Sequence, residues 1–201
     1  MTHNLGISPE TQFWQWFEKN ESRIFHFEKN QDQNISDLLR ELHRVNKSLT
    51  FEIGSEALET REFIISADGN RDAFPSVIRL AEAAPALPRW RITKFRPRRT
   101  DPCLLGIGDL QFSSDDVLVT LELEGSRIGV SLYLGDEDHF DEQILGRIGF
   151  LLLDYTLGEY DVETLVGTVS FHPKQRTYDP TSLSLRDLPS AFDQLTKSLS
   201  N

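Results

Sequence analysis

Cysteine is almost absent from this sequence, since Cys103 is the only one among 201 residues. An internal disulfide cannot form, which favours a reducing compartment. Long apolar runs are also missing, and the longest, at 148–153, is far shorter than the roughly 18 residues of a membrane-spanning helix. The first residues contain neither the basic segment nor the apolar segment of a signal peptide. We therefore expect a cytoplasmic protein without a membrane partner.

Positive charge is scarce as well. The chain has 21 Lys and Arg residues against 32 Asp and Glu residues, a formal net charge of −11. Such a surplus of carboxylates repels phosphate groups, so we expect no nucleic acid partner. The exception is the segment RWRITKFRPRR at 89–99, which holds six basic residues and no acidic one. We call this segment the basic strip.

Motifs for catalysis and cofactor binding are missing too. The sequence has no G-x-S-x-G motif, no phosphate-binding glycine loop and no H-E-x-x-H zinc motif. The densest acidic segment, 135–142, could offer Asp136, Asp138 and Asp141 to calcium, but it lacks the glycine and the glutamate of an EF-hand loop. We therefore expect capping and solvated charges there, and neither a cofactor nor a metal ion.

The residues that are present predict two helices near the N-terminus. The first covers 8–19, with Ser8 as its cap. Its wide aromatic face includes Trp14 and Trp16, and we expect this face to pack on the body of the protein. The alternative is an exposed face that binds a partner. The second helix is predicted at 35–47, with Asn34 or Ser36 as its cap.

The middle of the chain predicts the order β-β-α-β twice. Period-two alternation and helical periodicity place the first set at 49–54, 61–66, 72–84 and 90–95. The second set follows at 117–125, 127–135, 140–156 and 166–172. We interpret the two sets as an internal repeat. They predict an α+β fold with one common, largely antiparallel sheet and helices on one face.

One compact domain in five segments is the expected organisation. The segments are the N-terminal helices at 1–48, the first β-β-α-β unit at 49–96, a linker or edge strand at 97–116, the second β-β-α-β unit at 117–172 and a tail with a short helix at 173–201. Within the first unit, the acidic turn ISADGN at 65–70 is expected to convert a strand into a helix. Such a turn needs no ligand.

The basic strip is the first candidate for a functional surface. Its cations could converge on an anion or an acidic peptide, and they are Arg91, Lys94, Arg96, Arg98 and Arg99. The alternative is structural pairing with an acidic strand through Glu122 or Glu124. Because the sign of the strip opposes the rest of the molecule, it is the preferred binding surface if the chain has one.

A second acidic group, at 152–163, provides the alternative of an enzyme. Asp154 follows three leucines, and a partly buried carboxylate is a candidate acid or base. Gly158 is typical of a helix C-cap, after which Glu159 would begin an exposed turn. An enzyme would use Arg96 with Asp154 or Glu159 in a groove beside the sheet.

Three stretches of the chain, 13–25, 65–70 together with 73–98, and 152–171, resemble a family of bacterial cytosolic proteins without an assigned reaction. The resemblance transfers no catalytic residue to this chain. It implies a bacterial protein, and some similar proteins belong near toxin–immunity or regulatory loci.

The leading hypothesis is a non-catalytic, immunity-like binding or regulatory module. Its acidic body would attract a basic protein, such as a nuclease toxin, by complementary charge. The alternatives are the enzyme above and a homodimer formed through an edge strand or through the Trp14 and Trp16 face.

Overall fold

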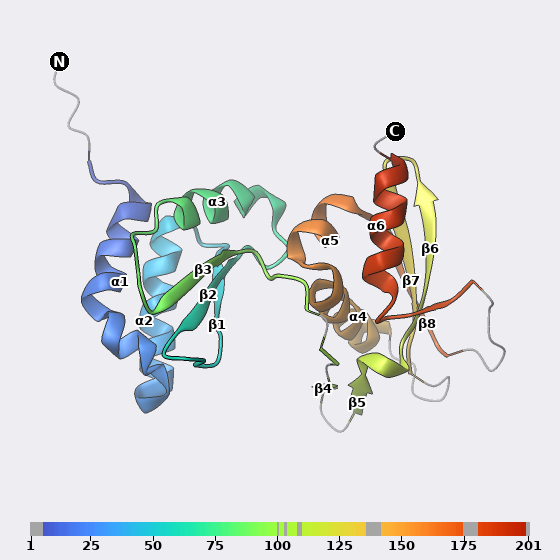
Figure 1. Cartoon of the computed structure of the whole chain (residues 1–201), viewed down its shortest axis with the longest axis horizontal. Coiled ribbons are helices and arrows are strands. Elements are labelled where there is room, and N and C mark those ends of the chain that lie inside the picture. The colour runs from blue at the N-terminus through green and yellow to red at the C-terminus, as the bar shows by residue number, and fades with distance from the viewer. Residues whose placement is uncertain are drawn as a thin grey trace, which may run out of the picture. The chain divides into compact units, whose positions relative to one another are not determined.

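The computed structural model divides the chain into two compact units, Met1–Arg96 and Pro97–Asn201. Each unit combines helices with a sheet of its own, and antiparallel pairs outnumber parallel ones, which confirms the α+β class (Figure 1). The residues that the structure describes are 6–99, 101–102, 104–107, 110–135, 142–174 and 181–199.

The sheet of the first unit has the strand order β1-β2-β3. β1 (Thr50–Ile53) and β2 (Arg61–Ser66) form an antiparallel hairpin. The chain then crosses over through η2 (Arg71–Ala73) and α3 (Phe74–Glu82), and β3 (Trp90–Lys94) pairs in parallel with β2. The predicted β-β-α-β order is therefore present in this unit.

Helices cover one face of this sheet. α1 (Pro9–Phe25) and α2 (Gln31–Val45), joined by η1 (Phe27–Asn30), pack on the side of β2 that carries Phe63 and Ile65. The same buried cluster includes residues of α1, α2 and α3, namely Phe13, Trp14, Phe17, Leu38, Leu42, Val77 and Leu80. Large aromatic rings dominate it, so burial of apolar area is the main stabilising contribution to this unit.

Both N-terminal helices are longer than predicted. The Ser8 hydroxyl accepts a hydrogen bond from the backbone N–H of Thr11 at 3.2 Å, so the predicted cap is confirmed. The first helix runs on to Phe25, and the second begins at Gln31, with Asn30 at its N-cap. Asn34 or Ser36 as the cap is therefore wrong, because both residues lie inside α2.

The backbone conformation of the turn after β2 redirects the chain into the next helix. Asp68 and Gly69 have φ angles of 50° and 78°, in the left-handed region that glycine adopts without strain. The Asn70 side chain then accepts a hydrogen bond from the backbone N–H of Asp72 at 3.1 Å and caps η2. The turn thus converts a strand into a helix, as expected.

The second unit repeats the path of the first. β6 (Leu118–Glu124) and β7 (Arg127–Tyr133) form an antiparallel hairpin, and β8 (Val166–His172) pairs in parallel with β7. The crossover between β7 and β8 passes through α4 (Glu142–Leu157) and α5 (Glu159–Leu165). A common chain path is thus shared by the two units, and an origin by duplication stays a prediction.

The C-terminal segment completes the second unit. β9 (Leu183–Ser184) adds an antiparallel pair to β6, which gives the strand order β8-β7-β6-β9. α6 (Leu188–Leu199) occupies the predicted range 188–199. The buried cluster joins the sheet to α4 and α6 through Val119, Val130, Leu132, Leu145, Ile148, Leu152, Leu188 and Phe192.

The single common sheet of the prediction is wrong, because β3 and β6 belong to different sheets. β3 ends where Phe95 adopts a φ of 61°, and Pro97 follows two residues later. Proline cannot donate to a ladder, so the chain leaves the first sheet at this point. The segment predicted as a linker or edge strand contains a hairpin of β4 (Leu104–Ile107) and β5 (Leu110–Ser113), which is followed by η3 (Ser114–Asp116).

The exposed turn predicted after Gly158 is wrong. Glu159 is buried and is the first residue of α5. Gly158 does break the helical path, with a φ of 83°, but the chain resumes a helix at the next residue. Cys103 and the acidic residues Asp136, Asp138 and Asp141 lie outside the described residues.

Candidate functional site

The basic strip is spread over both units, and most of its cations form ion pairs with nearby carboxylates. In the first unit, Arg91 pairs with Glu62 at 3.0 Å and Lys94 pairs with Glu82 at 3.3 Å. Arg96 contacts Glu52 at 2.6 Å and Asp68 at 2.9 Å. These pairs favour the structural interpretation of the strip.

Arg98 has the most extensive contacts of the strip residues in the second unit. Its guanidinium reaches Asp161 at 2.5 Å and Asp193 at 2.9 Å, and it donates to the carbonyl oxygen of Leu157 at 2.8 Å. Burial opposes the charged form, but the hydrogen bonds to both carboxylates raise the pKa of Arg98 above its ordinary value. Arg98 therefore ties α5 and α6 to the segment that follows Arg96.

Arg99 is the remaining member of the strip, and it lies in the second unit. Its backbone N–H donates to the carbonyl oxygen of Tyr155 at 2.8 Å, and it lines a cavity of about 360 Å³ together with Asp101, Asp115 and Arg186. The expected partners Glu122 and Glu124 appear in none of the ion pairs above. The carboxylate of Glu124 instead accepts a hydrogen bond from the backbone N–H of Thr168 at 2.8 Å.

The two tryptophans of the first helix have different surroundings. Trp14 is 2% exposed, and its indole N–H donates to the carbonyl oxygen of Leu80 at 2.7 Å. Trp14 is thus part of the core, and its selection as a binding residue is wrong. Trp16 is half-buried, and the guanidinium carbon of Arg23 lies 6.0 Å from the centroid of its ring.

The residues chosen for an enzyme do not share a unit. Arg96 belongs to the first unit, where it contacts Glu52 and Asp68, whereas Asp154 and Glu159 belong to the second. Glu159 is fully buried, and Asp154 is half-buried. The structure thus does not place Arg96 in one unit with either carboxylate, and the enzyme stays an alternative prediction.

A row of polar side chains on the second sheet was not predicted from the sequence. Ser131 of β7 faces Ser170 of β8 with their hydroxyl oxygens 2.8 Å apart, and Nε2 of His172 lies 3.1 Å from the Ser170 hydroxyl. Tyr133 stacks on His172. Within the described ranges no carboxylate contacts His172, so the row lacks the orienting acid of a catalytic triad. We interpret it as cross-strand pairing.

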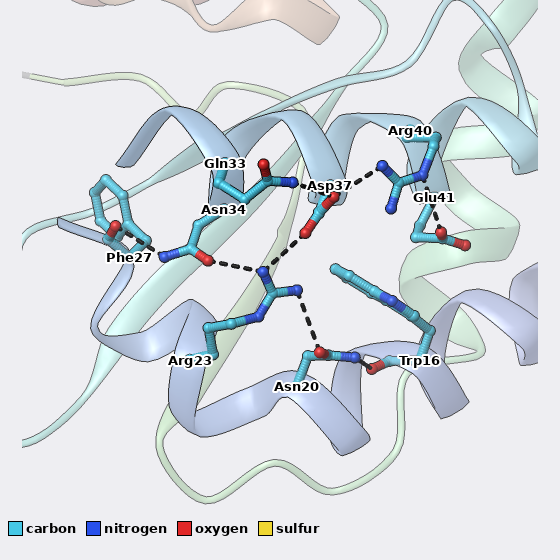
Figure 2. Close-up of polar contacts among 9 residues, drawn as sticks. All are labelled: Trp16, Asn20, Arg23, Phe27, Gln33, Asn34, Asp37, Arg40 and Glu41. Carbon is cyan, nitrogen blue, oxygen red and sulfur yellow. Dashed lines mark hydrogen bonds and ion pairs between the residues drawn. The ribbon is translucent and has the colours of Figure 1, made fainter. Parts of the chain in front are cut away.

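A second network that the sequence analysis missed joins α1 to α2 (Figure 2). One terminal nitrogen of Arg23 donates to the Asn34 side-chain oxygen at 2.9 Å and to Asp37 at 2.8 Å. The other terminal nitrogen donates to the Asn20 side-chain oxygen at 3.2 Å. The Asn34 amide, 2% exposed, in turn donates to the carbonyl oxygen of Phe27 at 3.0 Å. Arg23 is therefore held in one position from both helices.

Asp37 is the anionic centre of this network. Besides Arg23, it accepts hydrogen bonds from Gln33 and Arg40, each at 2.8 Å. Hydrogen bonds from Arg23 and then Arg40 hold the pKa of the Asp37 carboxyl below its ordinary value, because they favour the ionised form.

This pKa shift predicts a pH dependence for the first unit. A carboxyl with a lowered folded-state pKa adds stability above its unfolded pKa, and this stability is lost as the pH falls through the folded value. Asp37→Asn should therefore flatten the acid limb of the stability curve, measured by denaturant unfolding between neutral and acidic pH. Asp32→Asn, at an exposed position of α2 without a described ion pair, is the control. Equal acid limbs in the two variants would contradict the prediction.

A hollow opens beside Arg23. It has a volume of about 450 Å³ and lies among the end of α1, η1 and the start of α2. The described residues of its lining include no carboxylate and are Lys19, Asn20, Ser22, Arg23, His26, Lys29, Asn30 and Asn34. We call it the α1–α2 hollow. A basic, amide-rich lining is suited to an anion rather than a cation.

The two units differ sharply in net charge. Met1–Arg96 contains 14 acidic and 13 basic residues, for a formal charge of −1. Pro97–Asn201 contains 18 acidic and 8 basic residues, for a formal charge of −10. The acidity of the chain therefore resides almost entirely in the second unit.

No group of three or more His, Cys, Asp or Glu side chains in the described ranges could hold a metal ion. None of the described helices combines the length and the apolar character needed to cross a membrane.

Comparison with known proteins gives no match: neither a family model, nor a curated protein, nor a solved structure is similar to this chain.

Proposed function

We propose that the protein is a non-catalytic binding module whose second unit associates with a basic protein. The observation that carries this proposal is the formal charge of −10 on Pro97–Asn201. A charge of this size on one unit creates a negative potential that accelerates encounter with a positively charged surface. The nearly neutral first unit adds little to that potential.

The ion pairs of the second unit support the same conclusion. Arg98, Lys174 and Arg186 all face carboxylates of their own unit, so their charges are compensated locally. By contrast, Asp101 and Glu122 are exposed and form no ion pair within the described ranges. Such carboxylates remain available to the cations of a partner.

Capture of a partner from an extract of the source organism tests the proposal. The full-length chain is immobilised at low ionic strength, and the retained protein is identified and then purified. We expect a basic protein whose association rate falls as salt rises, because salt screens long-range attraction. An acidic partner, or the absence of a partner at low salt, would count against the proposal.

Two matched double variants locate the binding surface. The test variant removes two exposed charges of the second unit that form no described ion pair and carries Asp101→Asn and Glu122→Gln. The control variant removes two such charges from the first unit and carries Glu18→Gln and Asp32→Asn. We expect slower association for the test variant alone. Equal rates for the two variants would contradict a surface on the second unit.

A further inference from the structure

Most cations of the first unit have a carboxylate partner, and two of the exceptions line the α1–α2 hollow. Nine of the 13 basic residues of the first unit form ion pairs. The four that pair with no described carboxylate are Lys19, Lys29, Lys47 and Arg71. Two of these four, Lys19 and Lys29, line the hollow from α1 and η1.

The position of Arg23 is the second observation. Its terminal nitrogens are occupied by Asn34, Asp37 and Asn20, so the guanidinium is immobilised before any ligand arrives. Its Nε–H group donates to no atom of the described residues. A guanidinium that is held in place loses little conformational entropy when it binds an anion.

The lining of the hollow combines basic residues with neutral donors. Lys19, Arg23 and Lys29 line it, and Asp37, which also pairs with Arg40, contacts only Arg23 among these three. The neutral groups beside them, Asn20, Ser22 and Asn30, add amide and hydroxyl donors. The contacts of Arg23 with α2 already join the two helices, and neither lysine takes part in those contacts.

We propose that the α1–α2 hollow binds a small anion that carries a phosphate group. A phosphate offers several acceptor oxygens and up to two negative charges, which suits a lining that contains one arginine and two lysines. The volume of about 450 Å³ lies in the range of small-molecule sites, so the hollow admits a ligand larger than free phosphate. This site is independent of the acidic surface of the second unit.

Titration of the full-length chain with pyrophosphate tests the proposal. Because Arg23 lies over Trp16, a ligand that contacts Arg23 should change tryptophan fluorescence, and calorimetry gives the affinity independently. We expect a saturable signal at millimolar pyrophosphate or below. Inorganic phosphate should bind more weakly because it has fewer charges and contacts, and sodium chloride at equal ionic strength should give no saturable signal.

Charge-removing variants show where the ligand binds. The double variant Lys19→Gln/Lys29→Gln should bind pyrophosphate at least about tenfold more weakly, because two charge-assisted contacts are lost. These lysines are exposed and form no described ion pair, so the variant should keep the wild-type unfolding transition. Arg71→Gln removes one exposed charge outside the hollow and should leave the affinity unchanged.

The proposal is overturned by any of three results. The first is the absence of a saturable signal at millimolar pyrophosphate in low salt. The second is equal affinity in the wild type and the lysine double variant. The third is tighter binding of a single-stranded RNA oligonucleotide than of pyrophosphate, which would assign the lysines to a polymer surface instead.

Discussion

Replacing Phe17 by alanine is expected to destabilise the first unit by about 3–5 kcal/mol, the range for large aromatic residues in a core. The Phe17 side chain is 0% exposed. The centroid of its ring lies 5.4 Å from that of Trp14, 5.3 Å from that of Phe63 and 5.1 Å from that of Trp90. The substitution leaves a cavity at the point where α1, β2 and β3 meet, and these rings cannot all move to fill it.

Tryptophan fluorescence reports this effect selectively. The three tryptophans of the chain are Trp14, Trp16 and Trp90, and all belong to the first unit. A denaturant titration followed by fluorescence therefore measures the unfolding of that unit. Gln15→Ala, an exposed substitution on the same helix, should change the free energy of unfolding by no more than about 0.5 kcal/mol. A Phe17→Ala variant as stable as this control would refute the assignment of the core.

The elements that were predicted best have clearly bounded patterns. The strands at 61–66 and 166–172 and the helix at 188–199 match the structure at both ends. In these segments the apolar residues end at a turn residue or at a change of period, so the local signal and the tertiary fold agree. Such agreement explains why the fold class could be predicted from the chain alone.

The errors arise where a local signal is interrupted or ambiguous. The first helix continues through the polar residues 18–23 before it buries Ile24 and Phe25, and a gap of this length conceals the end of the apolar face. Gly158 has the positive φ of a helix end, but a second helix follows immediately. Nothing in the sequence distinguishes a terminating glycine from one that joins two helices.

The network around Arg23 could not be predicted because it is a product of helix packing. Arg23 and Asp37 are 14 residues apart and come together only because α1 crosses α2 at one position. The strip cations also find partners that are distant in sequence, such as Glu52 for Arg96. Crossing positions depend on how whole surfaces fit, and side-chain periodicity carries no information about them.

The second large effect is expected at Gly149 of α4. A Cβ atom at this position would overlap the ring of Phe171 on β8, and that ring also packs edge-on against Phe150. Gly149→Ala should therefore destabilise the second unit by about 1–3 kcal/mol, as overpacking does, despite the better helix propensity of alanine. Hydrogen exchange of peptides from α4 and β8 measures the loss of protection in this unit.

Gly146 provides a matched control one helical turn earlier. A Cβ atom there would lie 3.5 Å from the nearest atom of Phe171, an ordinary contact, so Gly146→Ala should stabilise α4 by up to about 1 kcal/mol. Removing the ring should also abolish the penalty, because Gly149→Ala then has nothing to overlap. The two substitutions at Gly149 and Phe171 are thus expected to be strongly non-additive. Equal exchange in the Gly146→Ala and Gly149→Ala variants would show that α4 does not pack on Phe171 in this way.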